Sequence, residues 1–332
     1  MKNIDDNTVA ILGSINCDIV CGVENLPLPG QTVHGFEFQI YTGGKGANQA
    51  TQMALLGLHT VFLGLVGDDE NGTFVKSGLS GKGVDTSNLI IAPTAATGCA
   101  LITVAKDGIN TIVHAAGANA SLSCDFVQSR SAVIQSAKLF VTQCEVNKDA
   151  LIEGLKIAHN SGAMTILNPS PATPLKDEVY KTISYIIPNE TESEVLSGIS
   201  IKGENEQRQE ALRKSSQWFL DRGVKNVCIT LGGDGAYFFD GKTECFVAPP
   251  PAIVADTTAA GDSFLGGFVY GILKGMDISS LLRFANSCGS YACESKGAAS
   301  SIGTKEQILK RYKDYIGVDC IGGHYADSKV CE

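Results

Sequence analysis

The stretch ANQATQMALLGLHTVFLGLV, residues 47–66, places a helical pattern directly before a buried strand. In residues 47–56 small and apolar side chains recur at helical spacing, whereas residues 60–66 are apolar without alternation. Continuous apolarity over so short a run is typical of a strand buried on both faces, as in a parallel sheet. The stretch therefore predicts one helix-to-strand unit of an α/β fold.

The same alternation continues along the chain. Further apolar runs bounded by turn residues occupy 9–15, 138–144, 164–167, 183–187 and 226–231. Further helical patterns occupy 126–136, 148–159, 207–220, 262–274, 279–296 and 304–315. We expect a single α/β domain over residues 1–316, with a Rossmann-like, mostly parallel central sheet flanked by helices. The polar, Gly-containing segment 317–332 is expected to be an unstructured tail.

Two segments interrupt this alternation. Residues 20–41 are rich in Pro and Gly and lack helical periodicity, while 98–105 and 111–115 resemble a strand pair around the turn 106–108. These segments predict a small β-sheet from about 16–41 and 98–115 that projects from the main body as a lid.

Composition restricts the class of protein. The 332 residues are 44% hydrophobic and 18% charged, with a formal net charge of −9. Such a composition suits a globular protein with a substantial core and excludes disorder as the main state. Because nucleic-acid binders concentrate Lys and Arg on one face, the acidic balance predicts no nucleic-acid partner. No segment approaches the roughly 20 apolar residues of a membrane span, so we expect no membrane partner.

The expected location is the cytoplasm. Residues 1–8 lead into an apolar run that is too short and too acidic for a secretory signal. Eleven cysteines are scattered without a C-x-x-C pair, which leaves a zinc ribbon unsupported. Such scatter is typical of reduced thiols that serve as small core residues.

The first motif with chemical content is TGGKGANQA, residues 42–50. It is not a P-loop, because no Ser or Thr follows Lys45, and it does not match G-x-G-x-x-G either. Gly43 and Gly44 permit close backbone approach, and the Asn48 amide offers donors and an acceptor that suit a polyhydroxylated ligand. The alternative interpretation is a Gly-rich helix N-terminus with a solvated Asn.

The second motif is ADTTAAGDSF, residues 255–264, followed by an apolar helix. Small residues before a helix leave its first N–H groups uncovered, and this end of the helix dipole favours an anion. Asp262 in the first turn could be only a capping residue. A phosphoryl-transfer site, however, needs a carboxylate next to its anion hole to accept the proton of the attacking hydroxyl, and Asp262 has that position.

Residues 256–262 resemble the D-T-x-[GA]-A-G-D signature, and residues 43–48 the G-G-K-G-x-N signature, of the ribokinase (PfkB) family of carbohydrate kinases. The resemblance continues, in the order of the family, at GSINCD (13–18), NPSP (168–171), PNETE (188–192) and TLGGDG (230–235). It spans about residues 9–301. We therefore expect the family's α/β fold and its ATP-dependent phosphorylation of a sugar hydroxyl.

The resemblance also implies roles for individual residues. Asp262 would be the catalytic base, with the anion hole at Gly261 and Ala260. The sugar would contact Asn16, Asp18, Gly43, Gly44, Lys45, Asn48, Glu145 and Asp262. ATP would contact Asn189, Thr230, Gly232, Gly233, Gly235, Gly261 and Asn286. Glu192 would lie near Mg²⁺, through water, and an activating K⁺ would lie at Asp256, Thr258, Ala292, Ser295, Gly297 and Ser301.

Two departures from the family pattern concern the K⁺ site. Ser300 stands where a Pro often precedes the last cation-site Ser, and Ser295 replaces a longer residue. Because backbone carbonyls would hold the ion, we expect these changes to be tolerated. The resemblance further implies a homodimer in which the two lids clasp each other.

The expected reaction is phosphorylation of D-ribose at O5. Other kinases of the same family, acting on 2-deoxyribose, fructose, a keto-deoxy sugar acid or a nucleoside, are the alternative, and a sugar sensor without catalysis is a third. The polar residues Asn16, Asp18 and Asn48 favour a compact polyol over a nucleoside. The presence of Asp262 argues against a sensor, which needs no general base.

Overall fold

A nine-stranded sheet forms the middle layer of the computed structural model, which describes residues 7–203 and 205–319. Its strand order is β13-β12-β11-β10-β9-β8-β1-β4-β5. The strands are β1 (Thr8–Leu12), β4 (His59–Gly67), β5 (Leu89–Ala92), β8 (Leu139–Gln143), β9 (Met164–Asn168), β10 (Tyr185–Ile186), β11 (Asn226–Thr230), β12 (Ala236–Phe239) and β13 (Glu244–Val247). Neighbours from β5 to β11 pair in parallel, whereas β12 and β13 are antiparallel. The predicted α/β fold with a mostly parallel sheet is confirmed.

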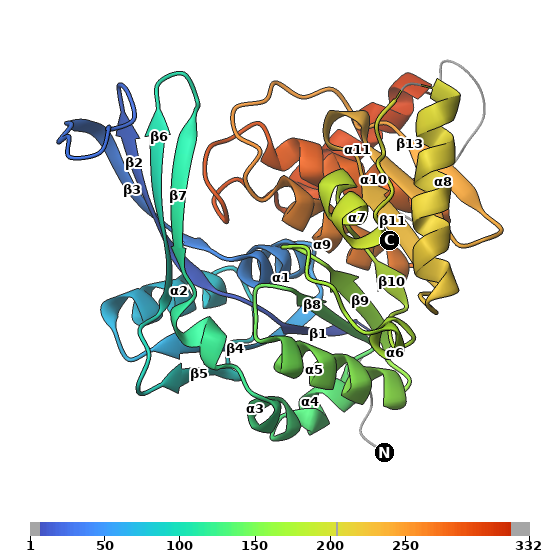
Figure 1. Cartoon of the computed structure of the whole chain (residues 1–332), viewed down its shortest axis with the longest axis horizontal. Coiled ribbons are helices and arrows are strands. Elements are labelled where there is room, and N and C mark those ends of the chain that lie inside the picture. Colours follow the sequence, from blue (N-terminus) through green and yellow to red (C-terminus); the bar gives the residue numbers. More distant parts are fainter. Residues whose placement is uncertain (1–6, 204, 320–332) are drawn as a thin grey trace.

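Helices cover both faces of this sheet (Figure 1). One face carries α1 (Lys45–Leu55), α2 (Glu70–Ser80), α9 (Ala260–Leu273), α10 (Ile278–Ala292) and α11 (Lys305–Asp319). The other carries α3 (Cys124–Gln128), α4 (Ser131–Ser136), α5 (Lys148–Asn160), α6 (Asp177–Tyr180) and α8 (Asn205–Asp221), and α7 (Glu190–Ser197) contacts α8. None of the helices in the described part of the chain is both long and apolar enough to cross a bilayer.

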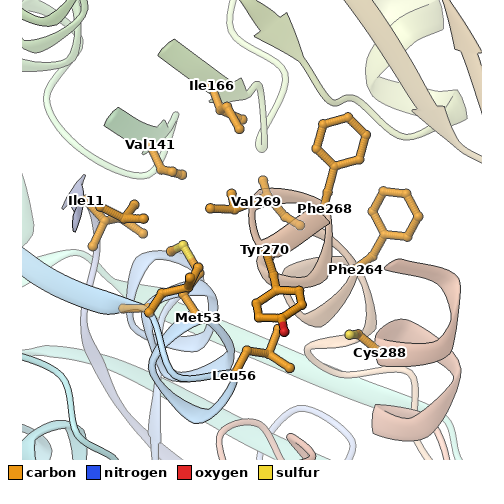
Figure 2. Packing of buried hydrophobic residues seen from close by; sticks show 14 of the residues in the cluster. Ile11, Met53, Leu56, Val141, Ile166, Phe264, Phe268, Val269, Tyr270 and Cys288 are labelled. Atoms are coloured by element: carbon orange, nitrogen blue, oxygen red, sulfur yellow. The ribbon is translucent and has the colours of Figure 1, made fainter. Parts of the chain in front are cut away.

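Strand β1 shows why the apolar runs do not alternate. Val9 and Ile11 pack into the hydrophobic core on the α1 and α9 face, while Ala10 and Leu12 pack into the core on the other face. In Figure 2, Ile11 lies with Met53 of α1 and Val269 of α9. Burial on both faces explains why the run from Val9 to Leu12 is apolar without alternation.

Cysteines contribute to these cores as expected. Cys17, Cys228 and Cys288 are buried free thiols. Figure 2 shows Cys288 beside Phe264 in the core between α9 and α10.

A second, four-stranded sheet projects from the body (Figure 1). Its order is β3-β2-β6-β7, with β2 (Asn16–Val23), β3 (Gly35–Gly43), β6 (Gly98–Ala105) and β7 (Asn110–Ala115). We call this sheet the lid. Cross-strand pairing places Ile40, Ile19, Leu101 and Val113 in one row across it. Asp18 belongs to the opposite face, because successive residues of a strand point to opposite sides.

Several sequence-based boundaries are corrected. The helix expected at 126–136 is two helices, α3 and α4, because the Ser129 hydroxyl bonds back to Phe126 O and competes with helix continuation. The helix expected at 279–296 ends at Ala292, where Cys293 O accepts from the backbone N–H of Asp256. Helix α11 continues past 316 to Asp319, and the rest of the expected tail lies outside the described residues.

Candidate active site

Two helices begin at the edge of the sheet where the parallel strands have their carboxyl ends. The N–H of Ala47 in α1 donates to Ser14 O, just after β1, over 3.0 Å. A Cβ on Gly46 would lie 2.6 Å from the Gly13 Cα, so the close approach of α1 to this turn requires glycine. The residues that follow β1, β8 and β9 therefore face the first turns of α1 and α9.

Asp262 lies in the first turn of α9 and is buried. Its Oδ2 accepts a hydrogen bond of 3.0 Å from Asn48 Nδ2, and its Oδ1 accepts one of 2.9 Å from Gln49 Nε2. Burial raises the pKa of the Asp262 carboxyl, while the charge of Lys45 and the two amide donors oppose that shift. A carboxylate with a raised pKa is a better proton acceptor, which suits a general base.

The N-terminus of α9 has the features of an anion hole. Ala259 adopts the left-handed conformation, with φ of 60°, and no side chain caps the helix. Ala260 N donates to Thr257 O, but none of the described residues accepts from the N–H of Gly261 or Asp262. A Cβ on Gly261 would meet no atom within 4 Å. The open space and the free donors are next to the Asp262 carboxylate, which favours a bound anion there.

Asp18 and Glu145 add two carboxyl groups to this region. Asp18 lies on β2, and a Cβ on Gly43 would overlap its carboxylate, so a side chain at position 43 would displace Asp18. Burial, together with the charges of Glu145 and Asp262, raises the pKa of Asp18 to about 7. Glu145 Oε2 accepts from the Ser14 hydroxyl over 2.6 Å and from the Lys45 backbone N–H over 3.2 Å.

The residues predicted to bind the sugar differ in whether their polar atoms already have hydrogen-bond partners. Asn48 Oδ1 is buried and has no donor among the described residues. Asn16, in contrast, has partners at both ends of its amide: Oδ1 accepts from Asn119 Nδ2 over 2.8 Å, and Nδ2 lies 3.2 Å from His114 Nε2. Asn119 has no motif of its own and was not predicted. Only the folded chain brings it to Asn16.

The predicted nucleotide residues lie at the carboxyl ends of β10 and β11. Asn189 caps α7 by accepting from Glu192 N over 2.8 Å, and Glu192 Oε2 accepts from Asn189 N over 2.9 Å. A β-bridge joins Asn189 to Thr230. A Cβ on Gly232 or Gly233 would meet nothing within 4 Å, so this turn faces open space.

Two of the residues predicted to bind the nucleotide contact the carbonyl group of Val247. Asn286 Nδ2 donates to Val247 O over 2.8 Å and is buried. Gly235 has φ of 101°, and a Cβ there would overlap the same carbonyl. Asn286 therefore holds the end of β13 in place, and Gly235 lets the backbone approach it closely.

The residues predicted to surround K⁺ come from the loop before α9 and from the end of α10 with the segment that follows it, and Asp256 joins the two. Its Oδ1 accepts from Thr258 N over 2.9 Å, and its Oδ2 accepts from Gly297 N over 3.0 Å. Ala292 and Ser301 are buried, and Ser295 is exposed. The Asp256 carboxylate thus ties the loop that precedes the anion hole to the segment after α10.

A buried carboxylate beside a helix N-terminus with free N–H groups is the arrangement that phosphoryl transfer to a hydroxyl needs. The family model for pfkB family carbohydrate kinases matches residues 6–305. The chain therefore belongs to the pfkB family of carbohydrate kinases and is an ATP-dependent sugar kinase.

Relatives of this family cover nearly the whole chain. A ribokinase of Haemophilus influenzae is 38% identical over 304 residues, which cover 91% of this chain and 97% of the relative. A deoxyribokinase of Salmonella typhi is 29% identical over 301 residues, 90% of this chain and 97% of the relative. The structure of an Arabidopsis thaliana ribokinase complexed with ribose and ATP matches with a TM-score of 0.83 and 31% identity, over 92% of this chain and 99% of that chain.

Proposed function

We propose that the protein transfers the γ-phosphoryl group of ATP to O5 of D-ribose, with Asp262 as the general base. The observation that carries this proposal is the pair formed by Asp262 and Asn48. Asn48 Oδ1 is a buried acceptor without a donor, and Asn48 Nδ2 is bonded to Asp262 Oδ2. A sugar hydroxyl would donate to the amide oxygen, since leaving a buried acceptor unpaired costs about 1–3 kcal/mol.

The residues present account for each part of the reaction. Asp262 accepts the proton of the primary hydroxyl while the oxygen of that hydroxyl forms a bond to the γ-phosphorus. The bond between the γ-phosphorus and the β,γ-bridging oxygen breaks, and ADP leaves with that electron pair. The N–H groups of Gly261 and Asp262 lie next to the base, where they would stabilise the charge on the transferring group.

Sugar specificity would come from Asp18, Glu145 and the backbone at Gly43 and Gly44. Gly44 has φ of 91° and packs against the backbone of Ser14 and Ile15. Short polar side chains and close backbone suit a compact polyol better than a nucleobase, which needs an apolar or aromatic surface.

Two cations fit the residues present. Glu192 is buried, and one of its oxygens is used by the α7 cap, so it would hold Mg²⁺ through water. Mg²⁺ supplies charge neutralisation on the phosphates. Both oxygens of Asp256 accept from backbone N–H groups, so the carbonyls of the two loops would hold K⁺ and Asp256 would orient them.

The lid supports a homodimer. Its apolar row leaves Leu101 52% exposed and Val113 66% exposed, and Phe38, which is paired with Cys21 on the same face, is 63% exposed. Apolar surface of this kind usually marks an interface. Because the row lies on the face opposite to Asp18, a second lid could cover it without blocking the sugar.

The test is an ADP-release assay with D-ribose, 2-deoxyribose, fructose and adenosine at equal Mg·ATP. We expect kcat/KM for ribose to exceed the others by at least about tenfold, since a site built to bond a hydroxyl discriminates against an analogue that lacks it. Nuclear magnetic resonance of the product identifies the phosphorylated oxygen. A preference for 2-deoxyribose would overturn the substrate while leaving the enzyme class intact.

A further inference from the structure

Gln49 lies on α1 next to Asn48 and is fully buried against Asp262. Its Nε2 donates to Asp262 Oδ1 over 2.9 Å and to Asn168 Oδ1 over 3.2 Å. Its Oε1 accepts from Gln143 Nε2 over 2.6 Å, and Gln143 is itself fully buried at the end of β8. One buried amide therefore connects the carboxylate of α9 to two strands of the central sheet.

The orientation of the Gln49 amide follows from its neighbours. An ionised carboxylate only accepts hydrogen bonds, so Gln49 must turn its NH₂ group toward Asp262. Asn168 Nδ2 donates to Ile187 O over 2.8 Å, which leaves Asn168 Oδ1 as an acceptor for Gln49. The Gln49 oxygen then faces the donor of Gln143. Every polar end of Gln49 thus meets its complement while its NH₂ group faces Asp262.

The charged groups around Asp262 do not by themselves keep it ionised. Lys45 on α1 favours the ionised carboxylate, but Glu145, after β8, disfavours it, and so does burial. The negative charge of Asp18 on β2 also repels the Asp262 carboxylate. With two acidic neighbours against one basic neighbour, hydrogen-bond donors become important for the charge state of the base.

We propose that Gln49 is a positioning residue for phosphoryl transfer: its amide holds Asp262 Oδ1, so that Oδ2, beside Asn48, is presented to the sugar hydroxyl. The proposal rests on the proposed role of Asp262 as general base. Gln143 extends it, because its Nε2 donates to Gln49 Oε1 and so favours the orientation in which the Gln49 NH₂ group faces Asp262. In this proposal neither Gln49 nor Gln143 contacts the sugar or the phosphate, and both act through Asp262.

Gln52 provides a matched control on the same helix. It is as fully buried as Gln49, but its Nε2 donates to Gly303 O over 3.1 Å and not to Asp262. Gln49→Leu and Gln52→Leu therefore remove a buried amide of the same size from the same helix. Only the first removes a donor from the base.

The experiment measures kcat for ribose against pH in both variants and in Gln49→Glu, which keeps the shape of Gln49 but turns its donor into an acceptor. We expect Gln49→Leu to lower kcat by about tenfold or more and to move the acid limb of the kcat profile upward by about one pH unit, because the ionised base loses a donor. Gln49→Glu should move that limb further. In Gln52→Leu the acid limb of the kcat profile should stay at the wild-type pH, even if the melting temperature falls by as much as in Gln49→Leu.

Circular dichroism establishes that each variant is folded at the assay temperature. An acid limb at the wild-type position in Gln49→Leu would make Gln49 a packing residue and overturn the proposal. If Gln49→Leu is unfolded, Gln49→Glu decides by the same criterion. A wild-type protein that phosphorylates no sugar would overturn the proposed function as well, whereas an active wild type with unshifted variants overturns only the role of Gln49.

Discussion

Asp18 is a carboxyl group that the fold buries without a hydrogen-bond donor from the described residues. Its raised pKa, about 7, follows from burial and from the nearby charges of Glu145 and Asp262. A carboxyl that is ionised in the unfolded chain at pH 5 is thus protonated in the folded one. Such a residue lowers stability at neutral pH, and it persists where a ligand supplies the missing donors.

Replacing Asp18 should therefore stabilise the ligand-free protein. Because the folded pKa lies above the unfolded value of 3.8, the stability of the wild type falls as pH rises from about 4 to about 7. Asp18→Asn should remove this loss, on the order of 4 kcal/mol above pH 7 and almost nothing at pH 4. Denaturant unfolding at both pH values measures the difference. Equal stabilisation at both would show that charge is not the cause.

The same substitution should weaken ribose binding far more than ATP binding. The ionised Asp18 would accept from sugar hydroxyls, so its loss leaves those hydroxyls unmatched at about 1–3 kcal/mol. Titration calorimetry with each ligand measures the two affinities. Equal losses of affinity for ribose and ATP would mean that Asp18 has been wrongly assigned to the sugar site.

Asp262→Asn should separate chemistry from binding. The amide is close to the carboxylate in size but cannot accept the proton, so kcat should fall by about 10²-fold or more. Affinities for ATP and ribose, measured by calorimetry, should remain within a few-fold of the wild type. A variant with near-normal kcat would remove Asp262 from the role of base.

At the scale of elements, the proposed anion hole depends on the loop before α9. Asp256 joins this loop to the segment after α10 through Thr258 N and Gly297 N. If K⁺ is held by the carbonyls of both segments, the ion and the carboxylate together order the N–H groups of the hole before phosphoryl transfer. Its contribution to catalysis would then be conformational.

Activity should rise several-fold when K⁺ replaces Na⁺ or tetramethylammonium at constant ionic strength and Mg²⁺, which separates a specific site from general screening. Asp256→Ala should abolish the difference. Asp240→Ala is a matched control, since Asp240 also accepts from two backbone N–H groups in a turn, but in the turn between β12 and β13. Equal wild-type rates in all three salts would contradict a K⁺ site, and the departures at Ser295 and Ser300 would explain it.

Elements and site were predictable to different degrees. The buried strands were predictable because burial on both faces leaves continuous apolar runs, as in β1. The antiparallel strands β12 and β13 were missed, since both are short. Motifs pointed to Asp262 and Asn48, but Gln49 gave no separate signal. A buried amide gains its role only from partners far away in sequence, here 94 and 213 residues from Gln49.

At the scale of the molecule, the lid gives the protein a second, exposed sheet with two different faces. One face carries Asp18, and the other carries the apolar row through Leu101. Exposed strands with such a row are prone to association, and a second lid would bury the row. The proposed homodimer would then hold each lid over its own sugar site.

Light scattering at micromolar concentration should give the mass of a dimer for the wild type and of a monomer for Leu101→Glu, because a charge in the centre of the row cannot be buried without a partner. Ile253→Glu is the matched control, since Ile253 is 87% exposed and lies outside the lid. A monomeric wild type would contradict the dimer. A dimeric Leu101→Glu would place the interface elsewhere.

The alternation of β2 also limits how the lid can change in evolution. Asp18 and Ile19 are neighbours in the chain but point to opposite faces, one toward the proposed sugar site and one within the apolar row. Deleting one residue from β2 would reverse the face to which the side chains beyond the deletion point. A carboxylate would then point toward the proposed interface, and an apolar side chain would point toward the proposed sugar site. Insertions and deletions of a single residue within this strand should therefore be tolerated less well than those in the loop at residues 24–34, which belongs to no strand.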